Sequence, residues 1–298
     1  MPAENFTDAY LINAAHKGDR LAADQLLRRY LPFVYALVRR AVGDSPDVDD
    51  VVQETMVRAL ADLGTLRAPD RFRAWLATIA VHQVSTYLRR RRRMSDRRAG
   101  LAEADDLQPG ASVEDTAVLQ QALSHERRQV ADSARWLDPA DRLLLSLWWL
   151  EVAGYLSRSE VAAATGVGLA HAAVRVQRMR AQLDTARSVV AALQAHPRCP
   201  VLATVAEGWN GQPNPLWRKR FARHLRDCRA CSRFSQALIP PEQLLAGFAL
   251  LPVPAALSAD LFGKAAGGAA VAGAAKGGLL AHLAHLVAAH PVAAIVAG

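Results

Sequence analysis

The chain has 298 residues, with 36 Lys and Arg against 28 Asp and Glu and a formal net charge of +8. Hydrophobic residues make up 51% of it and charged residues 21%, which excludes a wholly disordered chain. Three cysteines are too few for a secreted disulfide framework, and the first residues, MPAENFTDAY, lack a basic and apolar leader. The basic excess predicts a polyanionic partner, and we expect a cytoplasmic protein.

Apolar residues recur three and four positions apart through most of the chain, and no convincing strand pattern appears. The sequence therefore predicts an all-α protein built of small domains. Glycines, prolines and charge runs give the boundaries. The predicted parts are a helical block at 1–95, a flexible acidic linker at 96–117, a second helical block at 118–194, a cysteine module at 195–240 and an Ala/Gly-rich tail at 241–298.

Residues 47–63 are predicted to form an amphipathic helix, with Ser45 as its N-cap and Pro46 at its first helical position. Apolar residues form one stripe of this helix. Charged faces of this kind are usually only solvated, so the pattern alone leaves open whether this one binds a partner. The residues that share the polar face are Asp49, Asp50, Gln53 and Glu54.

The next predicted helix mixes aromatic rings with arginines and ends in five consecutive arginines, 89–93. Arginines neutralise phosphates and rings stack on unpaired bases, which is what binding of single-stranded nucleic acid requires. The alternative is that Phe72 and Trp75 are core residues. The candidate nucleic-acid contacts are Arg71, Phe72, Arg73, Trp75, His82, Gln83, Arg89 and Arg90.

The second block carries a helix-turn-helix pattern. Asp138 and Pro139 begin one helix, Ser157 and Glu160 form a capping box for a short one, and Gly166 supplies a turn before a helix over about 169–193. Arg and Gln side chains on such a helix can pair with base edges in the major groove, although an ordinary solvated helix has the same pattern. The candidate contacts are His171, Arg175, Gln177, Arg178 and Gln182.

DVDDVVQETMVRAL followed by FRAWLATIAVHQVSTYLRRRRR resembles the second conserved region of bacterial sigma factors of the extracytoplasmic-function (ECF) group. The resemblance implies two small helical sigma domains, with core RNA polymerase and promoter DNA as partners. It implies that the polar face of residues 47–63 docks on the clamp helices of the polymerase, and that residues 72–93 melt and read the −10 element. Residues 137–183 resemble the fourth conserved region, which reads the −35 element.

The sequence departs from that family at several positions. His82 and Thr86 stand where the family often has Asn and Asp, and His171, Ala173 and Val174 replace residues that are usually Thr, Lys and Ser. Two or three extra residues lie near 152–154. The resemblance therefore leaves base preference in the −10 element open and implies weaker DNA affinity in the second block.

All three cysteines fall in one module, with the spacing C-x24-H-x3-C-x2-C. Three thiolates and an imidazole complete the tetrahedral coordination of a zinc ion, which leaves no open coordination position for hydrolytic chemistry. Alternatives are unrelated buried thiols, a Cys228–Cys231 redox pair, or His196 as the fourth ligand. The predicted ligands are Cys199, His224, Cys228 and Cys231, with His224 and Cys228 facing one way on a helix.

The same spacing resembles the zinc-containing anti-sigma domain, in which the position of Cys199 is commonly His. This implies a structural zinc and an anti-sigma contact, made within the chain or by a separate protein. We therefore predict a sigma factor that directs core RNA polymerase to promoters and is regulated in cis by its zinc module. The alternative is a free helix-turn-helix regulator.

No Gly-rich phosphate loop, nucleophile elbow or H-E-x-x-H motif occurs in the sequence, so no enzyme is predicted. The apolar residues 279–298 leave three interpretations open, which are a truncated membrane span, a loosely packed helix and disorder. A membrane contact thus stays undecided at this point.

Overall fold

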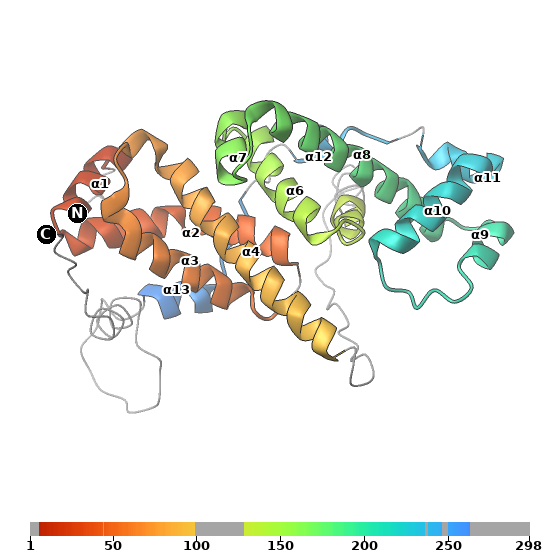
Figure 1. The fold of residues 1–298 in the computed structure, drawn as a ribbon, viewed down its shortest axis with the longest axis horizontal. Helices are drawn as coiled ribbons and strands as arrows, with labels where there is room; N and C mark the ends of the chain where they lie inside the picture. Colours follow the sequence, from red (N-terminus) through yellow and green to blue (C-terminus); the bar gives the residue numbers. More distant parts are fainter. Residues whose placement is uncertain (1–5, 44, 99–127, 236–237, 246–249, 263–298) are drawn as a thin grey trace, which may run out of the picture.

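The computed structural model describes residues 6–43, 45–98, 128–235, 238–245 and 250–262. Within these ranges every regular element is a helix and no strand occurs, which confirms the predicted all-α class (Figure 1). The acidic linker beyond Arg98 and the apolar run at 279–298 lie outside the described residues. None of the helices in the described part is both long and apolar enough to cross a bilayer.

The first block is built around α2, against which α1, α3 and α4 pack. Asp19 caps α2, because its carboxylate accepts hydrogen bonds from the N–H groups of Leu21 and Ala22 at 2.9 and 3.1 Å. Buried apolar side chains such as Val34 and Leu76 fill the space between the helices. The elements are α1 (Asp8–His16), α2 (Arg20–Val42), α3 (Val48–Asp62), the short 3-10 helices η1 (Leu63–Thr65) and η2 (Pro69–Arg71), and α4 (Phe72–Arg98).

The predicted N-cap of α3 was wrong by two residues. Asp47, not Ser45, is its N-cap, and Pro46 lies outside the helix. The Ser45 hydroxyl oxygen accepts the N–H of Asp47 at 3.3 Å, so Ser45 stabilises the turn that precedes the helix.

The second block has the predicted helix-turn-helix. Residues 128–134 are helical and lead into α6 (Pro139–Val152), α7 (Arg158–Ala164) and α8 (Leu169–Gln194). The Asp138 carboxylate caps α6 by accepting the N–H of Asp141 at 2.9 Å. Gly166 has φ of +67°, the left-handed conformation that lets the chain turn between α7 and α8. The caps and the turn confirm the local predictions for this block.

The C-terminal part contains short helices. Those of the cysteine module are α9 (Pro200–Val205), α10 (Pro215–Asp227), α11 (Arg229–Ser232) and η3 (Arg233–Ser235). Beyond it, α12 (Pro241–Leu245) and α13 (Ala255–Phe262) lie within the predicted Ala/Gly-rich tail at 241–298, of which residues 246–249 and 263–298 lie outside the described residues. Leu244, Leu257 and Leu261 are buried in the same core as the two blocks, so this part of the chain is folded against them.

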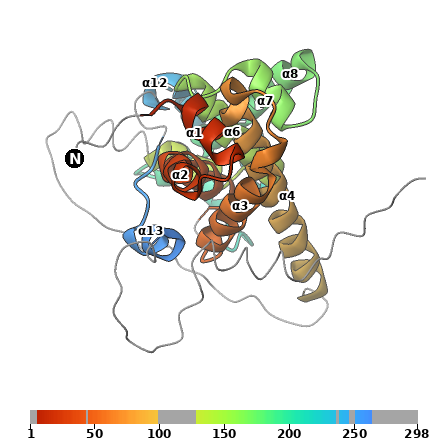
Figure 2. The same cartoon turned by 90° about the vertical axis from the view of Figure 1, so that its left-hand side faces the viewer.

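The two blocks lie against one another. α2 packs along α6, and α4 packs against α7 (Figure 2). We call this the closed arrangement. At this junction the Arg40 guanidinium lies 4.1 Å from the centre of the Trp149 ring, and burial lowers the pKa of Arg40 to about 10. One hydrophobic core therefore runs through both blocks, while a second, aromatic core joins the cysteine module to the end of α8.

Candidate polymerase, DNA and metal sites

The predicted polymerase-docking residues share one side of α3. Asp50 and Glu54 are exposed, Asp49 and Gln53 are partly exposed, and the opposite side of the helix is buried against α2 and α4. Neither Asp50 nor Glu54 has an ion-pair partner among the described residues. Residues one turn apart on a helix present a continuous surface, so α3 offers an anionic face with nothing of its own to neutralise it.

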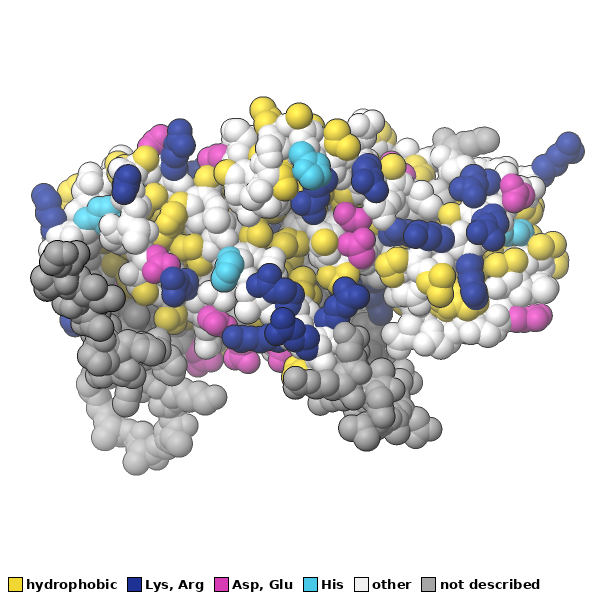
Figure 3. Space-filling model, viewed as in Figure 1, with side chains coloured by type: hydrophobic (Ala, Val, Ile, Leu, Met, Phe, Trp, Pro, Cys, Tyr) yellow, Lys and Arg dark blue, Asp and Glu magenta, His cyan; other side chains and the backbone are white. Residues whose placement is uncertain are grey.

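Most of the predicted −10 contacts are accessible on η2 and α4. The exposed residues are Arg71, Arg73, His82, Arg89 and Arg90, and Trp75 and Gln83 are partly exposed. Figure 3 shows Lys and Arg side chains gathered at the lower end of α4. Near the other end, Arg73 Nε donates to the Tyr30 hydroxyl at 3.2 Å. That bond raises the pKa of Arg73, whereas burial raises the pKa of Tyr30.

Phe72 does not fit the prediction that it contacts DNA. Its side chain is 1% exposed and its ring lies 4.8 Å from the ring of Tyr30, edge to face. The centre of the Trp75 ring is 5.6 Å from that of Phe72. A ring enclosed in this way cannot stack on an unpaired base, so Phe72 is a core residue that orients the start of α4.

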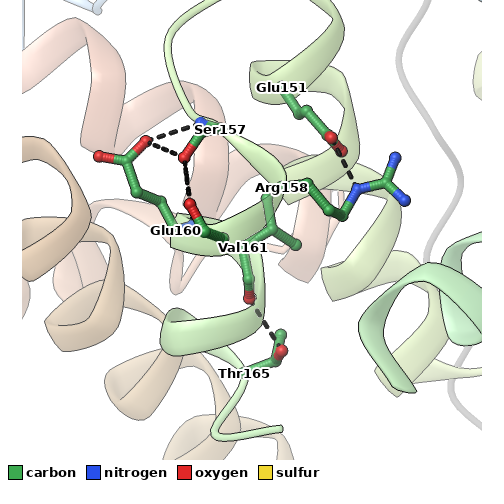
Figure 4. A network of polar contacts seen from close by, with 7 residues as sticks. Glu151, Ser157, Arg158, Glu160, Val161 and Thr165 are labelled. Atoms are coloured by element: carbon green, nitrogen blue, oxygen red, sulfur yellow. Dashed lines mark hydrogen bonds and ion pairs between the residues drawn. The ribbon is translucent and has the colours of Figure 1, made fainter. Parts of the chain in front are cut away.

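The helix-turn-helix is fixed by polar contacts around α7 (Figure 4). The Glu160 carboxylate accepts the backbone N–H of Ser157 at 2.6 Å, and the Ser157 hydroxyl accepts the N–H of Glu160 at 3.3 Å. Arg158 Nε donates to Glu151 at 2.6 Å, which ties α7 to α6 (Figure 4). Thr165 closes the helix by donating to the Val161 carbonyl at 2.8 Å. These contacts stabilise the turn from which α8 projects.

The predicted −35 contacts on α8 divide into two groups. His171, Gln177 and Arg178 are exposed and Arg175 is partly exposed. Gln182 is instead engaged within the protein: its Nε2 donates to Asp141 Oδ2 at 2.7 Å, and its Oε1 accepts from Arg218 of α10. The N-terminal half of α8 is therefore free for DNA, and Gln182 is a structural contact in this arrangement.

The four predicted metal ligands come together. Their ligand atoms all lie within 4.8 Å of one another, with Cys199 Sγ 3.7 Å from His224 Nε2 and 3.9 Å from Cys228 Sγ. Sulfur–zinc bonds of about 2.3 Å in a tetrahedron put two sulfurs about 3.8 Å apart, so the cluster fits that ion. The backbone N–H of Leu202 lowers the pKa of Cys199, whereas burial raises that of Cys231 to about 12.

Two details of the metal prediction need correction. Cys228 does not share a helix with His224, because α10 ends at Asp227 and Cys228 has extended backbone before α11. The cysteine is nevertheless brought back beside the imidazole by the turn. His196, the competing ligand, lies outside the cluster, where its Nδ1 contacts the Gln194 carbonyl at 2.8 Å.

Arg218 joins the cysteine module to the second block, a contact that the sequence analysis missed. Its side chain is 4% exposed, and its Nη1 donates to the Trp136 carbonyl at 2.8 Å while its Nη2 donates to Gln182. Burial lowers the pKa of Arg218, and Asp138 and Asp141 oppose that shift. The ring of Trp209 lies 5.4 Å from that of Trp136 in the same core. An arginine on the apolar side of α10 is the sequence signal that could have indicated this contact.

Residues 238–245 and 250–262, which we call the strap, touch both blocks. Arg187 of α8 is fully buried and donates to the Ile239 carbonyl at 2.7 Å, and Arg180 pairs with Glu242. At the other end, Phe262 of α13 contacts Arg28 of α2. In Figure 2, α12 lies beside the helices of the second block, and α13 lies below α2. The strap therefore spans the junction of the closed arrangement.

Residues 26–94 match the Sigma-70 region 2 family. The chain is 32% identical over 184 residues to the ECF RNA polymerase sigma-E factors of Salmonella typhimurium and Escherichia coli K12, covering 61% of this chain and 95% of each relative. The sigma-E factor of Haemophilus influenzae is 31% identical over 162 residues, covering 53% and 85%.

One solved structure is also similar, that of CnrH in complex with the cytosolic domain of CnrY. The match covers 59% of this chain and 94% of the matched chain, at 29% identity and a TM-score of 0.39.

Proposed function

The chain belongs to the family of ECF RNA polymerase sigma factors, and we propose which of its parts bind polymerase, promoter DNA and metal. It directs RNA polymerase to promoters for the initiation of transcription and is not itself an enzyme. The observation that carries this assignment is the match to region 2, whose residues 26–94 include α3 and most of α4. A free helix-turn-helix regulator would not need the first block at all.

The anionic side of α3 is the polymerase-docking face in this proposal. Asp50 and Glu54 are exposed and have no cation of their own within the described residues, so a basic partner surface can pair with both. Charge complementarity of this kind raises the association rate and selects the partner.

Promoter DNA is contacted by two separate surfaces. The exposed arginines of α4 suit the melted −10 strand, because guanidinium groups pair with phosphates and the partly exposed Trp75 offers a ring for stacking. Arg178 and Gln177 on the free half of α8 suit base edges of the −35 duplex. Phe72 and Gln182 are left out of these surfaces, since both are engaged inside the protein.

Zinc is the metal that the cluster of Cys199, His224, Cys228 and Cys231 fits, and its role is structural. Four protein ligands fill a tetrahedron, so the ion would cross-link α9, α10 and α11 without an open coordination position. The chemistry it supplies is therefore stability of a small module that has few apolar residues of its own.

The closed arrangement is the resting state in this proposal. The −10 and −35 elements lie about 25 bp apart, which is about 85 Å along B-DNA. α4 and α8 both contact α7, so their axes approach within about 20 Å at that point. Because both helices pack on α7 in the closed arrangement, we expect the blocks to separate for promoter binding. The 30 residues from Arg98 to Arg128 can reach about 100 Å when extended, which is sufficient.

The strap, rather than the cysteine module, is positioned to restrain this separation. The helices of the module have their main contacts with α8, whereas the strap touches α2, α6 and α8. Tethering places the strap at an effective concentration of order mM, so modest contacts can hold the closed arrangement. We thus assign regulation in cis to residues 238–262 and a supporting role to the module.

Run-off transcription with purified core polymerase tests the assignment. The full chain and a chain ending at Ser235, which keeps all four predicted metal ligands, are compared on promoters selected from genomic fragments. Transcripts that depend on the added chain are expected, with more from the shorter one. No transcripts from either chain would reject the sigma assignment, and equal amounts would reject restraint by the strap.

A further inference from the structure

The cysteine module carries most of the excess positive charge of the protein. Residues 195–235 contain eight Lys and Arg against two acidic residues, a net charge of +6 out of +8 for the whole chain. Neither a structural zinc site nor the contact with α8 explains this excess, because the contact uses Arg218 alone. The remaining cations therefore call for a separate explanation.

These cations gather on the outer side of α10. Trp217, Phe221 and Leu225 face the aromatic core, and the opposite side of the helix is mainly charged, with Leu216 exposed at its start. The exposed cations on that side are Lys219, Arg220, Arg223 and Arg226, and Arg229 follows on α11. Residues three and four apart on a helix are neighbours, so these like charges repel one another and destabilise the free helix.

No acidic side chain within the described residues neutralises this surface. Lys219, Arg223, Arg226 and Arg229 form no ion pair there, and Arg220 lies over the ring of Trp217 at 4.7 Å. Figure 3 shows Lys and Arg side chains over α10 on the same face of the molecule as those over α8 and the end of α4. The basic surface of α10 thus continues the side of the protein on which the DNA-binding surfaces lie.

We propose that the outer side of α10 binds the phosphate backbone of duplex DNA next to the segment that α8 reads. Arginine pairs with phosphate in a bidentate manner, and a surface on which five cations outnumber one exposed carboxylate, that of Asp227, fits a regular row of phosphates. The buried Arg218 and the aromatic core fix α10 to α8, so the module reaches DNA whenever α8 does. The module therefore extends the footprint of the sigma factor without reading sequence.

A membrane surface fits this helix less well. A helix that lies on a bilayer buries its apolar side among the lipids, but the apolar side of α10 is already buried in the protein. Leu216, at the start of the helix, is the exposed large apolar residue there.

The experiment measures binding of the full chain, without polymerase, to a fluorescent duplex of about 30 bp and random sequence at several salt concentrations. The variant is Arg223→Gln/Arg226→Gln, and the control is Lys17→Gln/Arg20→Gln, which removes the same charge from exposed positions just after α1 and at the start of α2. Metal content and helicity are measured for each protein. The inference rests on DNA contact by α8, yet this assay needs neither a promoter nor polymerase, so its failure leaves the transcription assay unaffected.

The association constant K for DNA falls as salt rises, and loss of two phosphate contacts is expected to make the slope of log K against log salt less steep by about 2. The ratio of wild-type to variant affinity should therefore fall about tenfold between about 50 and 200 mM salt. The control should match the wild type. Equal slopes for variant and control would overturn the proposal. The proposal would also be overturned if the variant bound DNA as the wild type does but lost binding to core polymerase, or to vesicles of phosphatidylglycerol and phosphatidylcholine.

Discussion

Arg28 and Phe262, 234 positions apart in the chain, are in direct contact. Arg28 Nη2 donates to the Phe262 carbonyl at 3.2 Å, and its guanidinium carbon lies 4.2 Å from the centre of the Phe262 ring. Asp24 accepts from Arg28 Nε at 2.8 Å and so holds the guanidinium in place. The contact anchors the end of the strap to the central helix of the first block.

Replacing Phe262 with Ala should release the strap from α2. The ring is 7% exposed, and removal of a buried ring costs about 3 kcal/mol, which raises the equilibrium constant for release about 100-fold. We expect more run-off transcript and a larger radius of gyration by X-ray scattering. Leu216→Ala, at an exposed leucine of α10, is the control. An unchanged radius of gyration would show that α13 does not hold the blocks together.

Reversing the charge of the α3 face should prevent holoenzyme assembly. In Asp50→Lys/Glu54→Lys, like charges would meet across the interface at a cost of several kcal/mol, so affinity for core polymerase should fall at least about 100-fold. Both side chains are exposed, so the fold should persist. Glu207→Lys/Asp227→Lys makes the same change of charge on the cysteine module and should bind core polymerase normally. Equal binding by the two variants in a pull-down would contradict the docking assignment.

Arg178 and Gln182 should behave differently although they lie one turn apart on α8. Loss of a base-edge contact in Arg178→Ala should cost about 1–3 kcal/mol and relax one position of the −35 element. Gln182→Ala should leave base preference unchanged and lower the melting temperature, because it leaves Arg218 and Asp141 without their partner. Selection from a randomised −35 library and thermal melting separate the two effects. A base-specific loss of DNA affinity in Gln182→Ala would show that Gln182 contacts DNA after all.

Metal analysis should find one zinc per chain. Cys231→Ser should lower the zinc content and loosen the aromatic core that contains Trp209 and Trp217, which shifts tryptophan emission to longer wavelength. His196→Ala should leave zinc unchanged, since that imidazole lies outside the cluster. Zinc near zero in the unmodified protein, or loss of zinc in His196→Ala, would reject the assigned ligand set.

Local signals made the helices and the metal cluster predictable. The capping residues Asp138 and Ser157 act on backbone groups three positions away, so they can be read from the sequence without knowledge of the fold. The cysteine spacing indicated the cluster for a related reason, because three of the four ligands lie within eight residues.

Contacts between distant segments were not predictable in this way. The face of α4 that holds Phe72 is buried by Tyr30 of another helix, and Gln182 is engaged by Arg218, 36 positions away. The strap was not predicted because α13 has only eight residues, which are too few to show a helical period in a segment rich in Ala and Pro. Its buried residues become evident only when α2 is placed beside them.

Because α13 is the last described helix, it is synthesised after both blocks. During synthesis the ribosome completes α8 at Gln194 before it reaches Phe262, about 70 residues later. At about 5–20 residues per second this interval lasts roughly 3–14 s. A nascent chain thus has both blocks but no strap for several seconds, and polymerase can capture it in that interval. Newly made molecules and aged ones should therefore differ in activity even when their sequence and surroundings are the same.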